Sequence, residues 1–236
     1  MQIALDGDLP HSSDLEQIGR MLPLEGARLL ELGCGAALTT RRLAETFPIG
    51  QLIAMEVDRV QHEKNLRIQD LPSVDFRVGS AQAIDLQDSS VDAVIMLKSL
   101  HHVPASDMDA AFSEIARVLR AGGLAYISEP VYAGDFNEIL RLFNDEKAVR
   151  KAAFEATCRA VESDRFQLVQ EVHFLNTTRF EGFEEFERRI MGATHSSFEI
   201  DKALHDRVRD MFLPHVGDDG IAEFLSPLRV DLLRKP

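Results

Sequence analysis

Residues 27–38, with the sequence ARLLELGCGAAL, constrain the fold more than any other segment. A short apolar run leads through Glu31 into two glycines, Gly33 and Gly35, and a helical pattern follows directly. Glycines at such a turn let backbone N–H groups at a helix N-terminus approach a ligand that a Cβ atom would keep away. The segment therefore predicts a strand, a loop and a helix that together bind a nucleotide-type cofactor.

The charge and size of two residues indicate which cofactor this is. A dinucleotide would bring a pyrophosphate to the turn, and the carboxylate of Glu31 would repel it. S-adenosylmethionine instead brings an ammonium and a sulfonium group, which a carboxylate attracts. The dinucleotide fingerprint also requires a small residue for close helix packing, where this chain has Leu38. S-adenosylmethionine is favoured, and a nicotinamide-dependent oxidoreductase stays as an alternative.

Strand and helix patterns alternate through the first half of the chain. Five strands are expected at residues 27–32, 51–56, 75–79, 93–97 and 124–128. Four helices are expected at residues 15–21, 39–47, 60–69 and 108–119. This alternation predicts an α/β fold with a doubly wound, mostly parallel sheet, whose ligand lies at the carboxyl ends of the strands.

The pattern changes after residue 130. Helical periodicity runs to about residue 161, either as one helix or as two with a break near Asn144. Residues 166–174 alternate like a strand, helices are expected at 183–191 and 202–212, and a last strand is expected at 228–234, with Pro227 just before it. All but three of the 14 phenylalanines lie from Phe136 onward, which favours core packing there over the wall of an apolar pocket.

Composition limits the classes of protein and partner. A chain of 236 residues is long enough for one large α/β domain, and its apolar runs are too short to cross a bilayer. The N-terminus carries Asp6 and Asp8 where a signal peptide would be basic and apolar, so a cytoplasmic location is expected. The formal net charge of −13 disfavours nucleic acid as a partner. Two cysteines, Cys34 and Cys158, make no disulfide framework.

Several motifs occur in an order that resembles a known family. ELGCG is followed by MEVD, with Glu56 placed 21 residues after Gly35, and then by VGSAQAIDL, SVDAVIMLKSLHHV and IARVLRAGGLAYISEP. This order resembles that of the class I S-adenosylmethionine-dependent methyltransferases over about residues 15–130, and most closely the small-molecule enzymes of ubiquinone-biosynthesis type. The resemblance implies a Rossmann-like sheet of seven strands with an antiparallel last strand.

The resemblance also implies the cofactor-binding residues. They are Glu31, Gly33, Cys34, Gly35, Glu56, Val57, Ser80, Ala81 and Leu97. Glu56 takes the position of the acid that holds the ribose hydroxyls. Ser80 departs from the family, which usually has Asp there to accept a hydrogen bond from adenine; a hydroxyl accepts one without the help of a charge.

Three residues are candidates for catalysis. His101 and His102 follow the fourth strand beside the expected point of methyl transfer, and an imidazole has the pKa that suits proton transfer near neutrality. The alternative is that these histidines only pack. Glu129 follows the fifth strand and is a second candidate for a base or for a carboxylate that orients the acceptor. No His, Asp and Glu cluster has metal-ligand spacing, so no metal site is predicted.

The predicted organisation is a single domain over residues 1–236. It comprises a cofactor-binding core at about 15–130, a helical cap at about 131–197, and a C-terminal helix and last strand at 198–236. The cap is expected to cover the methyl group and to select a small, largely apolar acceptor, with Arg188, Arg189 or His195 as a polar anchor. Methyl transfer to that acceptor is the predicted function, and a non-catalytic cofactor-binding subunit is the alternative.

Overall fold

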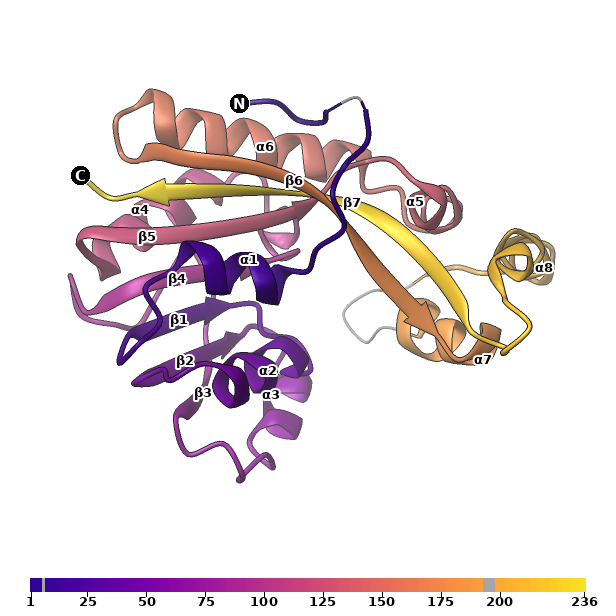
Figure 1. The fold of residues 1–236 in the computed structure, drawn as a ribbon, viewed down its shortest axis with the longest axis horizontal. Coiled ribbons are helices and arrows are strands. Elements are labelled where there is room, and N and C mark those ends of the chain that lie inside the picture. Colours follow the sequence, from indigo (N-terminus) through magenta and orange to yellow (C-terminus); the bar gives the residue numbers. More distant parts are fainter. Residues whose placement is uncertain (6, 193–197) are drawn as a thin grey trace.

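A sheet of seven strands organises the computed structural model, which describes residues 1–5, 7–192 and 198–236. The strand order is β3-β2-β1-β4-β5-β7-β6; the first five strands are parallel, and β7 is antiparallel to both β5 and β6 (Figure 1). The strands are β1 (Arg28–Leu32), β2 (Gln51–Glu56), β3 (Val74–Val78), β4 (Val91–Leu97), β5 (Leu119–Pro130), β6 (Gln167–Phe180) and β7 (Ala222–Arg234). The predicted α/β class, strand number and antiparallel last strand are confirmed.

Helices cover both faces of the sheet, as a doubly wound fold requires. They are α1 (Asp14–Met21), α2 (Leu38–Thr46), α3 (Arg59–Asn65), α4 (Met108–Val118), α5 (Asp135–Leu140), α6 (Lys147–Glu162), α7 (Gly182–Phe186) and α8 (Lys202–Phe212), with the short turns η1 (Leu100–His102), η2 (Glu187–Met191) and η3 (Leu213–His215). The expected helix at 60–69 is shorter than predicted, because Leu66 already forms the C-cap of α3.

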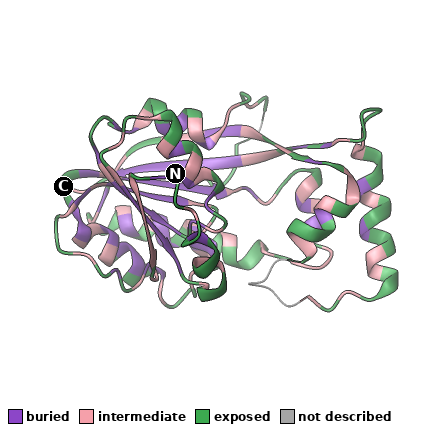
Figure 2. Cartoon of the chain, turned by 90° about the horizontal axis from the view of Figure 1, so that it is seen from below, coloured by how far each residue is buried: buried purple, intermediate pink, exposed green. Residues whose placement is uncertain are grey.

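The alternation of side chains along each strand divides the core into two layers. Leu29 of β1 packs with Ile18 of α1 on one face, while Leu30 packs with Phe112 of α4 on the other. Successive residues of a strand point to opposite faces, so a fully apolar strand contributes to both layers. Figure 2 shows the resulting concentration of buried residues in the strands.

The segment after β5 does not form one continuous cap. The helical pattern breaks between Leu140 and Lys147, so the two-helix alternative was correct. Helix α6 buries Ala153, Ala156 and Ala160 in the same core layer as α4, and it therefore covers the sheet. The alanines allow close packing, which the helical pattern alone did not reveal. The segment predicted as the cap, residues 131–197, thus includes one helix that packs on the sheet.

Beyond the end of β5, strands β6 and β7 continue as a two-stranded extension that carries α7 and α8 (Figure 1). Strand β7 begins at Ala222, six residues before the predicted start, and Pro227 lies inside it. Only β6 pairs with β7 at Pro227, since the pairing with β5 starts at Leu228. Proline is tolerated because no neighbour on the β5 side requires its missing N–H.

The extension has its own apolar core, which lies apart from the two layers of the sheet. Its buried members include Phe180, Phe186, Phe212 and Phe224, and Phe136 of α5 packs against them. Ring centroids in this group lie 5.1–6.2 Å apart, the spacing of favourable aromatic pairs. The crowding of phenylalanine in the second half is thus explained mainly by packing. Among the described residues, no helix has both the length and the apolar character to cross a membrane.

Candidate active site

The glycine loop between β1 and α2 lies at the carboxyl end of the sheet and is attached to β2. The N–H groups of Gly33 and Cys34 both donate to the carbonyl oxygen of Met55, at 2.9 and 3.0 Å. Gly33 and Gly35 have φ angles of +78° and +52°, which side chains disfavour. A Cβ at Gly33 would collide with Ser99, whereas one at Gly35 would point into open space. The open side of the loop is therefore at Gly35.

Glu56 ends β2 directly against this loop. One oxygen of its carboxylate accepts a hydrogen bond from the N–H of Gly35 at 2.8 Å, and the other accepts one from the N–H of Asp58 at 2.9 Å. Only 7% of Glu56 is exposed. The parallel pairing of β1 with β2 brings the loop and the acid together across 21 residues of sequence.

Glu31 is buried beneath the loop. Its carboxylate accepts a hydrogen bond from the hydroxyl of Thr40 in α2 at 2.6 Å. Burial raises the pKa of Glu31 to about 7, the hydroxyl of Thr40 opposes this rise, and the negative charge of Glu56 adds to it. Burial, with Glu31 and Glu56 nearby, also raises the pKa of the Cys34 thiol, so this thiol stays protonated.

The other predicted cofactor residues lie at the ends of neighbouring strands. Val57 follows β2 and is 67% exposed, although the strand before it is almost entirely buried. Ser80 and Ala81 follow β3, whose end is linked to β2 by a hydrogen bond of 3.1 Å from the Gly79 N–H to the Glu56 carbonyl. Leu97, half-buried, ends β4. All nine predicted residues therefore lie at the carboxyl ends of β1 to β4.

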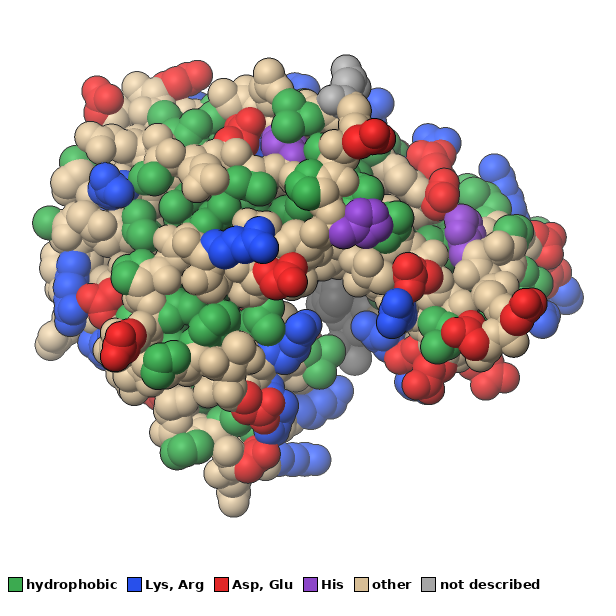
Figure 3. Space-filling view, in the orientation of Figure 1, with side chains coloured by type: hydrophobic (Ala, Val, Ile, Leu, Met, Phe, Trp, Pro, Cys, Tyr) green, Lys and Arg blue, Asp and Glu red, His purple; other side chains and the backbone are tan. Residues whose placement is uncertain are grey.

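A cavity of about 290 Å³ lies beyond the ends of β4 and β5. Its walls come from Lys98 after β4, from η1 and the end of β5, and from α5, the start of α6, β6, η2 and β7. Phe136, Leu140 and Ile190 are among its apolar members. In the view of Figure 3, the molecule is hollowed between the part that carries β1–β3 and the extension that carries α7 and α8.

The cavity and the cofactor loop meet at residues 98 and 99. Ser99 donates a hydrogen bond to the carbonyl oxygen of Leu32 at 2.8 Å and packs against Gly33, while Lys98 lines the cavity. Lys98 has a φ angle of +54°, and its ammonium group lies 2.6 Å from the carboxylate of Asp14 in α1. Sequence reasoning did not predict this ion pair with Asp14.

His101 and Glu129, both predicted as site residues, form a buried pair. The Nδ1 atom of His101 lies 2.5 Å from Oε2 of Glu129, and Oε1 of Glu129 accepts a hydrogen bond from the N–H of Leu100 at 2.9 Å. Both side chains are 3% exposed. The second contact holds the carboxylate on η1, so Glu129 fixes the orientation of the imidazole and leaves its Nε2 atom for another partner.

Glu146, which sequence reasoning missed, lies on the other side of His101. Its Oε2 atom is 3.9 Å from Nε2 of His101 and 2.6 Å from the guanidinium of Arg150, and its Oε1 atom accepts a hydrogen bond from Asn144 at 2.9 Å. Burial raises the pKa of Glu146, but the charges of His101 and Arg150 outweigh burial and leave the pKa below its usual value.

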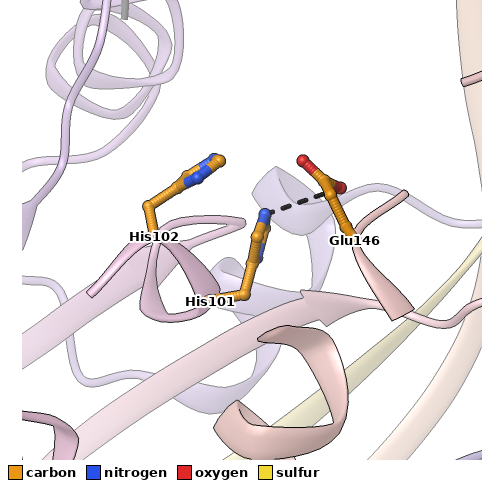
Figure 4. A group of neighbouring side chains, drawn as sticks. All are labelled: His101, His102 and Glu146. Carbon is orange, nitrogen blue, oxygen red and sulfur yellow. Dashed lines mark ion pairs between the residues drawn. The ribbon is translucent and has the colours of Figure 1, made fainter. Parts of the chain in front are cut away.

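His102 completes a group with His101 and Glu146. The ligand atoms of the three side chains lie within 4.8 Å of one another, and their ends converge in Figure 4. His101 is buried, Glu146 is partly exposed and His102 is exposed. The sequence spacing did not reveal this group, because Glu146 is distant in sequence and only the packing of α6 beside η1 brings it near.

The three predicted polar anchors of the cap differ in their position relative to the cavity. Arg189 lines the cavity and lies 5.0 Å from the ring centroid of Phe180, while Arg188 is not part of the cavity wall. His195 lies outside the described residues.

Comparison with known proteins identifies the core. Residues 30–127 match the family model described as "Methyltransferase domain". The chain contains a class I methyltransferase domain. Its cofactor class is S-adenosylmethionine, as the loop predicted. The matched residues include the glycine loop, Glu56, both histidines and all but the end of β5.

Curated relatives match less than half of this chain. An uncharacterized methyltransferase of Mycobacterium tuberculosis is 37% identical over 108 residues, which are 46% of this chain and 42% of the relative. A ubiquinone biosynthesis O-methyltransferase of Xanthomonas oryzae pv. oryzae is 31% identical over 115 residues, or 48% of this chain and 47% of the relative. The chain thus spans less than half the length of these relatives.

Solved structures share the fold across almost the whole chain. A methyltransferase structure from Bacillus halodurans superposes with a TM-score of 0.65 at 17% identity and covers 95% of this chain and 100% of its own. The structure of the [4+2]-cyclase SpnF superposes with a TM-score of 0.58 at 21% identity. This superposition covers 94% of this chain and 79% of the cyclase chain. The fold therefore also occurs in a protein named for a different reaction.

The residues at the loop fit S-adenosylmethionine. The open space beside Gly35 accommodates a ligand against the backbone, and the carboxylate of Glu56 lies at its edge. Val57 presents an exposed apolar side chain of the kind that packs against a base. These features suit an adenosyl group with ribose hydroxyls, whereas the buried acids beneath the loop do not suit a pyrophosphate.

Proposed function

We propose that this protein transfers a methyl group from S-adenosylmethionine to a small, largely apolar molecule bound in the cavity. The observation that carries the proposal is the junction at Lys98 and Ser99, because one of these neighbours lines the cavity and the other packs against the cofactor loop. An acceptor and a cofactor bound on the two sides of this junction would meet there. Holding two reactants in line can supply about 7–11 kcal/mol of the reduction in barrier.

The cofactor, when bound, supplies a methyl group on a sulfonium centre that is already a good leaving group. Glu56 binds the ribose hydroxyls, Val57 and Ala81 contact the adenine, and Ser80 accepts a hydrogen bond from its amino group. Glu31 attracts the cationic end of the cofactor from beneath the loop. Gly33, Cys34, Gly35 and Leu97 supply the backbone that surrounds the ligand.

His101 receives the proton that an acceptor hydroxyl or amine loses. Glu129 holds Nδ1, so the lone pair of Nε2 faces away from the carboxylate toward Glu146 and the cavity. A buried carboxylate that orients an imidazole in this way favours the tautomer required of a base. His102, in ring contact with His101 at 4.1 Å between centroids, borders the same space.

The cavity wall supports a largely apolar acceptor with a polar group. A volume of about 290 Å³ is near the lower end of the range for small-molecule sites, about 300–1,000 Å³. Asn137, Asn144 and Ser226 contribute polar side chains to this wall, next to its apolar members. Relatives named ubiquinone biosynthesis O-methyltransferase and fatty-acid O-methyltransferase agree with such an acceptor.

The test is transfer of labelled methyl groups. The protein is incubated with S-adenosylmethionine labelled on its methyl carbon and with fractionated small-molecule extract, and labelled products are separated by chromatography. We expect label in a small organic-soluble product, and no product with the Gly35→Val variant. Label that appears only in protein or nucleic acid would contradict the small-molecule proposal. Binding of S-adenosylhomocysteine without any transfer would favour a non-catalytic subunit.

A further inference from the structure

We propose that His101, His102 and Glu146 bind a divalent metal ion of the Zn²⁺ type at the wall of the cavity. The two histidines come from η1, and Glu146 precedes the first turn of α6. Their ligand atoms lie within 4.8 Å of one another, and the ends of the three side chains point toward a common space (Figure 4). Two imidazoles and one carboxylate are a donor set typical of catalytic zinc sites that keep a position open for substrate.

The spacing of the nearest pair suits such an ion. Nε2 of His101 and Oε2 of Glu146 are 3.9 Å apart, which is too long for a hydrogen bond. Two ligands of a tetrahedral zinc ion, each bound at about 2.0–2.2 Å, lie about 3.3–3.6 Å apart. A small side-chain adjustment would therefore bring both atoms into coordination.

Neighbouring groups already orient the ligands. Glu129 binds Nδ1 of His101, which leaves Nε2 as the coordinating atom, and this carboxylate–histidine arrangement is the usual support of a metal-bound imidazole. Asn144 and Arg150 hold the two oxygens of Glu146. Because these contacts already orient His101 and Glu146, the two side chains lose little conformational entropy when they bind an ion.

The local charge favours a cation. Two carboxylates, Glu129 and Glu146, border the imidazole of His101, and Arg150 is the positive group paired with one of them. Lys98 also lines the cavity, but its ammonium group is paired with Asp14 at 2.6 Å. A divalent ion balances the remaining negative charge.

A role for the ion in catalysis rests on the function proposed above, whereas binding of the ion does not. The ion would occupy the Nε2 atom of His101 that otherwise takes the proton of the acceptor. It would then lower the pKa of an acceptor hydroxyl in the cavity, and the released proton would pass to solvent water. In the absence of metal, the imidazole itself is the base.

The experiment is equilibrium dialysis of the untagged chain against Zn²⁺, followed by elemental analysis, with no cofactor or acceptor present. We expect one zinc ion per chain, and at least tenfold weaker binding by His102→Ala and by Glu146→Gln. Neither side chain is fully buried, so both variants should fold. A second measurement uses Co²⁺, whose visible absorption reports coordination by imidazole and should be lost in His102→Ala.

Two matched controls come from outside the cluster. Glu155 is an exposed carboxylate on α6 that pairs with Lys151 at 2.5 Å, and His11 is an exposed histidine. Glu155→Gln and His11→Ala should bind zinc like the parent protein. Glu129→Gln should weaken zinc binding by about 10- to 100-fold through loss of the group that orients His101.

The proposal is overturned if the parent chain retains no zinc, or if His102→Ala combined with Glu146→Gln binds zinc as tightly as the parent. Displacement of zinc by an equal concentration of Mg²⁺ would contradict the metal class, because Mg²⁺ prefers oxygen ligands. Titration with S-adenosylhomocysteine on the same samples separates the two proposals. If the protein binds the cofactor but not zinc, only the proposed metal site is contradicted. If it binds zinc but not the cofactor, only the methyltransferase proposal is contradicted.

Discussion

The cofactor side and the acceptor side of this molecule are built in different ways. The cofactor loop, Glu56 and the end of β3 come from adjacent parallel strands, and each occupies the position that the motif order predicts. The cavity instead collects residues from η1, β5, α5, α6, β6, η2 and β7, which are spread over more than half of the chain. Motifs thus specify the cofactor side locally, while the acceptor side depends on long-range packing.

The largest expected effect tests whether the cofactor side really depends on one backbone position. In Gly35→Val, a side chain would enter the open space beside the loop, where φ is +52°. We expect no measurable binding of S-adenosylhomocysteine in calorimetric titration, because the ligand and the side chain require the same space.

A matched control exists for this substitution. Gly122 also has a positive φ, +75°, and open space at its Cβ, but it lies in β5 away from the loop. Gly122→Val should suffer a similar backbone strain and still bind the ligand. Equal loss of binding in both variants would mean that strain, not the loop, is responsible.

The second prediction tests whether the acceptor side can be destabilised without a loss of cofactor binding. Phe180 is 1% exposed and packs in the core of the extension against Phe186, Phe212 and Phe224. We expect Phe180→Ala to reduce the free energy of unfolding by about 3–5 kcal/mol, because it leaves a cavity among these rings. Chemical denaturation measures this loss.

The affinity of folded Phe180→Ala for S-adenosylhomocysteine should stay within about twofold of the parent value, since no loop residue is among the described members of this core. The control is Phe112→Ala in α4, which should cause a loss of similar size in the core layer that includes Leu32 and Met55 beside the loop. A large loss of cofactor affinity in Phe180→Ala would show that the two sides are coupled.

The same contrast explains what the sequence could predict. The five parallel strands, the loop and Glu56 follow from patterns within short segments, and their predicted positions are within a few residues of those observed. Glu146 could not be predicted, because no pattern near it indicates that α6 packs beside η1. The early start of β7 was missed because Pro227 suggests a strand boundary. The neighbour on the β5 side, Val131, donates to the carbonyl oxygen of Pro227 and does not require its missing N–H.

The third prediction concerns the buried acid beneath the loop. The folded-state pKa of Glu31, about 7, lies above its ordinary value of 4.5, so the folded protein binds more protons than the unfolded chain between these pH values. Stability should therefore fall as pH rises from about 4.5 to about 7. Glu31→Gln removes this contribution. Between pH 4 and pH 8, the free energy of unfolding of the parent protein should therefore fall by up to about 3 kcal/mol more than that of the variant.

Denaturation at both pH values measures this difference directly. Burial also raises the pKa of Asp231, to about 6, but that group is present in both proteins and cancels in the comparison. If Glu31 attracts the cationic end of the cofactor, Glu31→Gln should bind S-adenosylhomocysteine more weakly than the parent at pH 8. A variant that is more stable at pH 8 and binds equally well would leave Glu31 with a structural role only.

The smallest expected effect is that of Glu56→Ala, which removes the acid at the edge of the loop. Its carboxylate accepts hydrogen bonds from the N–H groups of Gly35 and Asp58 at 2.8 and 2.9 Å. Loss of the partner for the ribose hydroxyls should weaken binding of S-adenosylhomocysteine by about 1–3 kcal/mol. Glu63→Ala, on the following helix, is the matched control and should bind normally. Unchanged affinity in folded Glu56→Ala would mean that the loop backbone alone recognises the cofactor, and the cofactor side would then depend on a single motif.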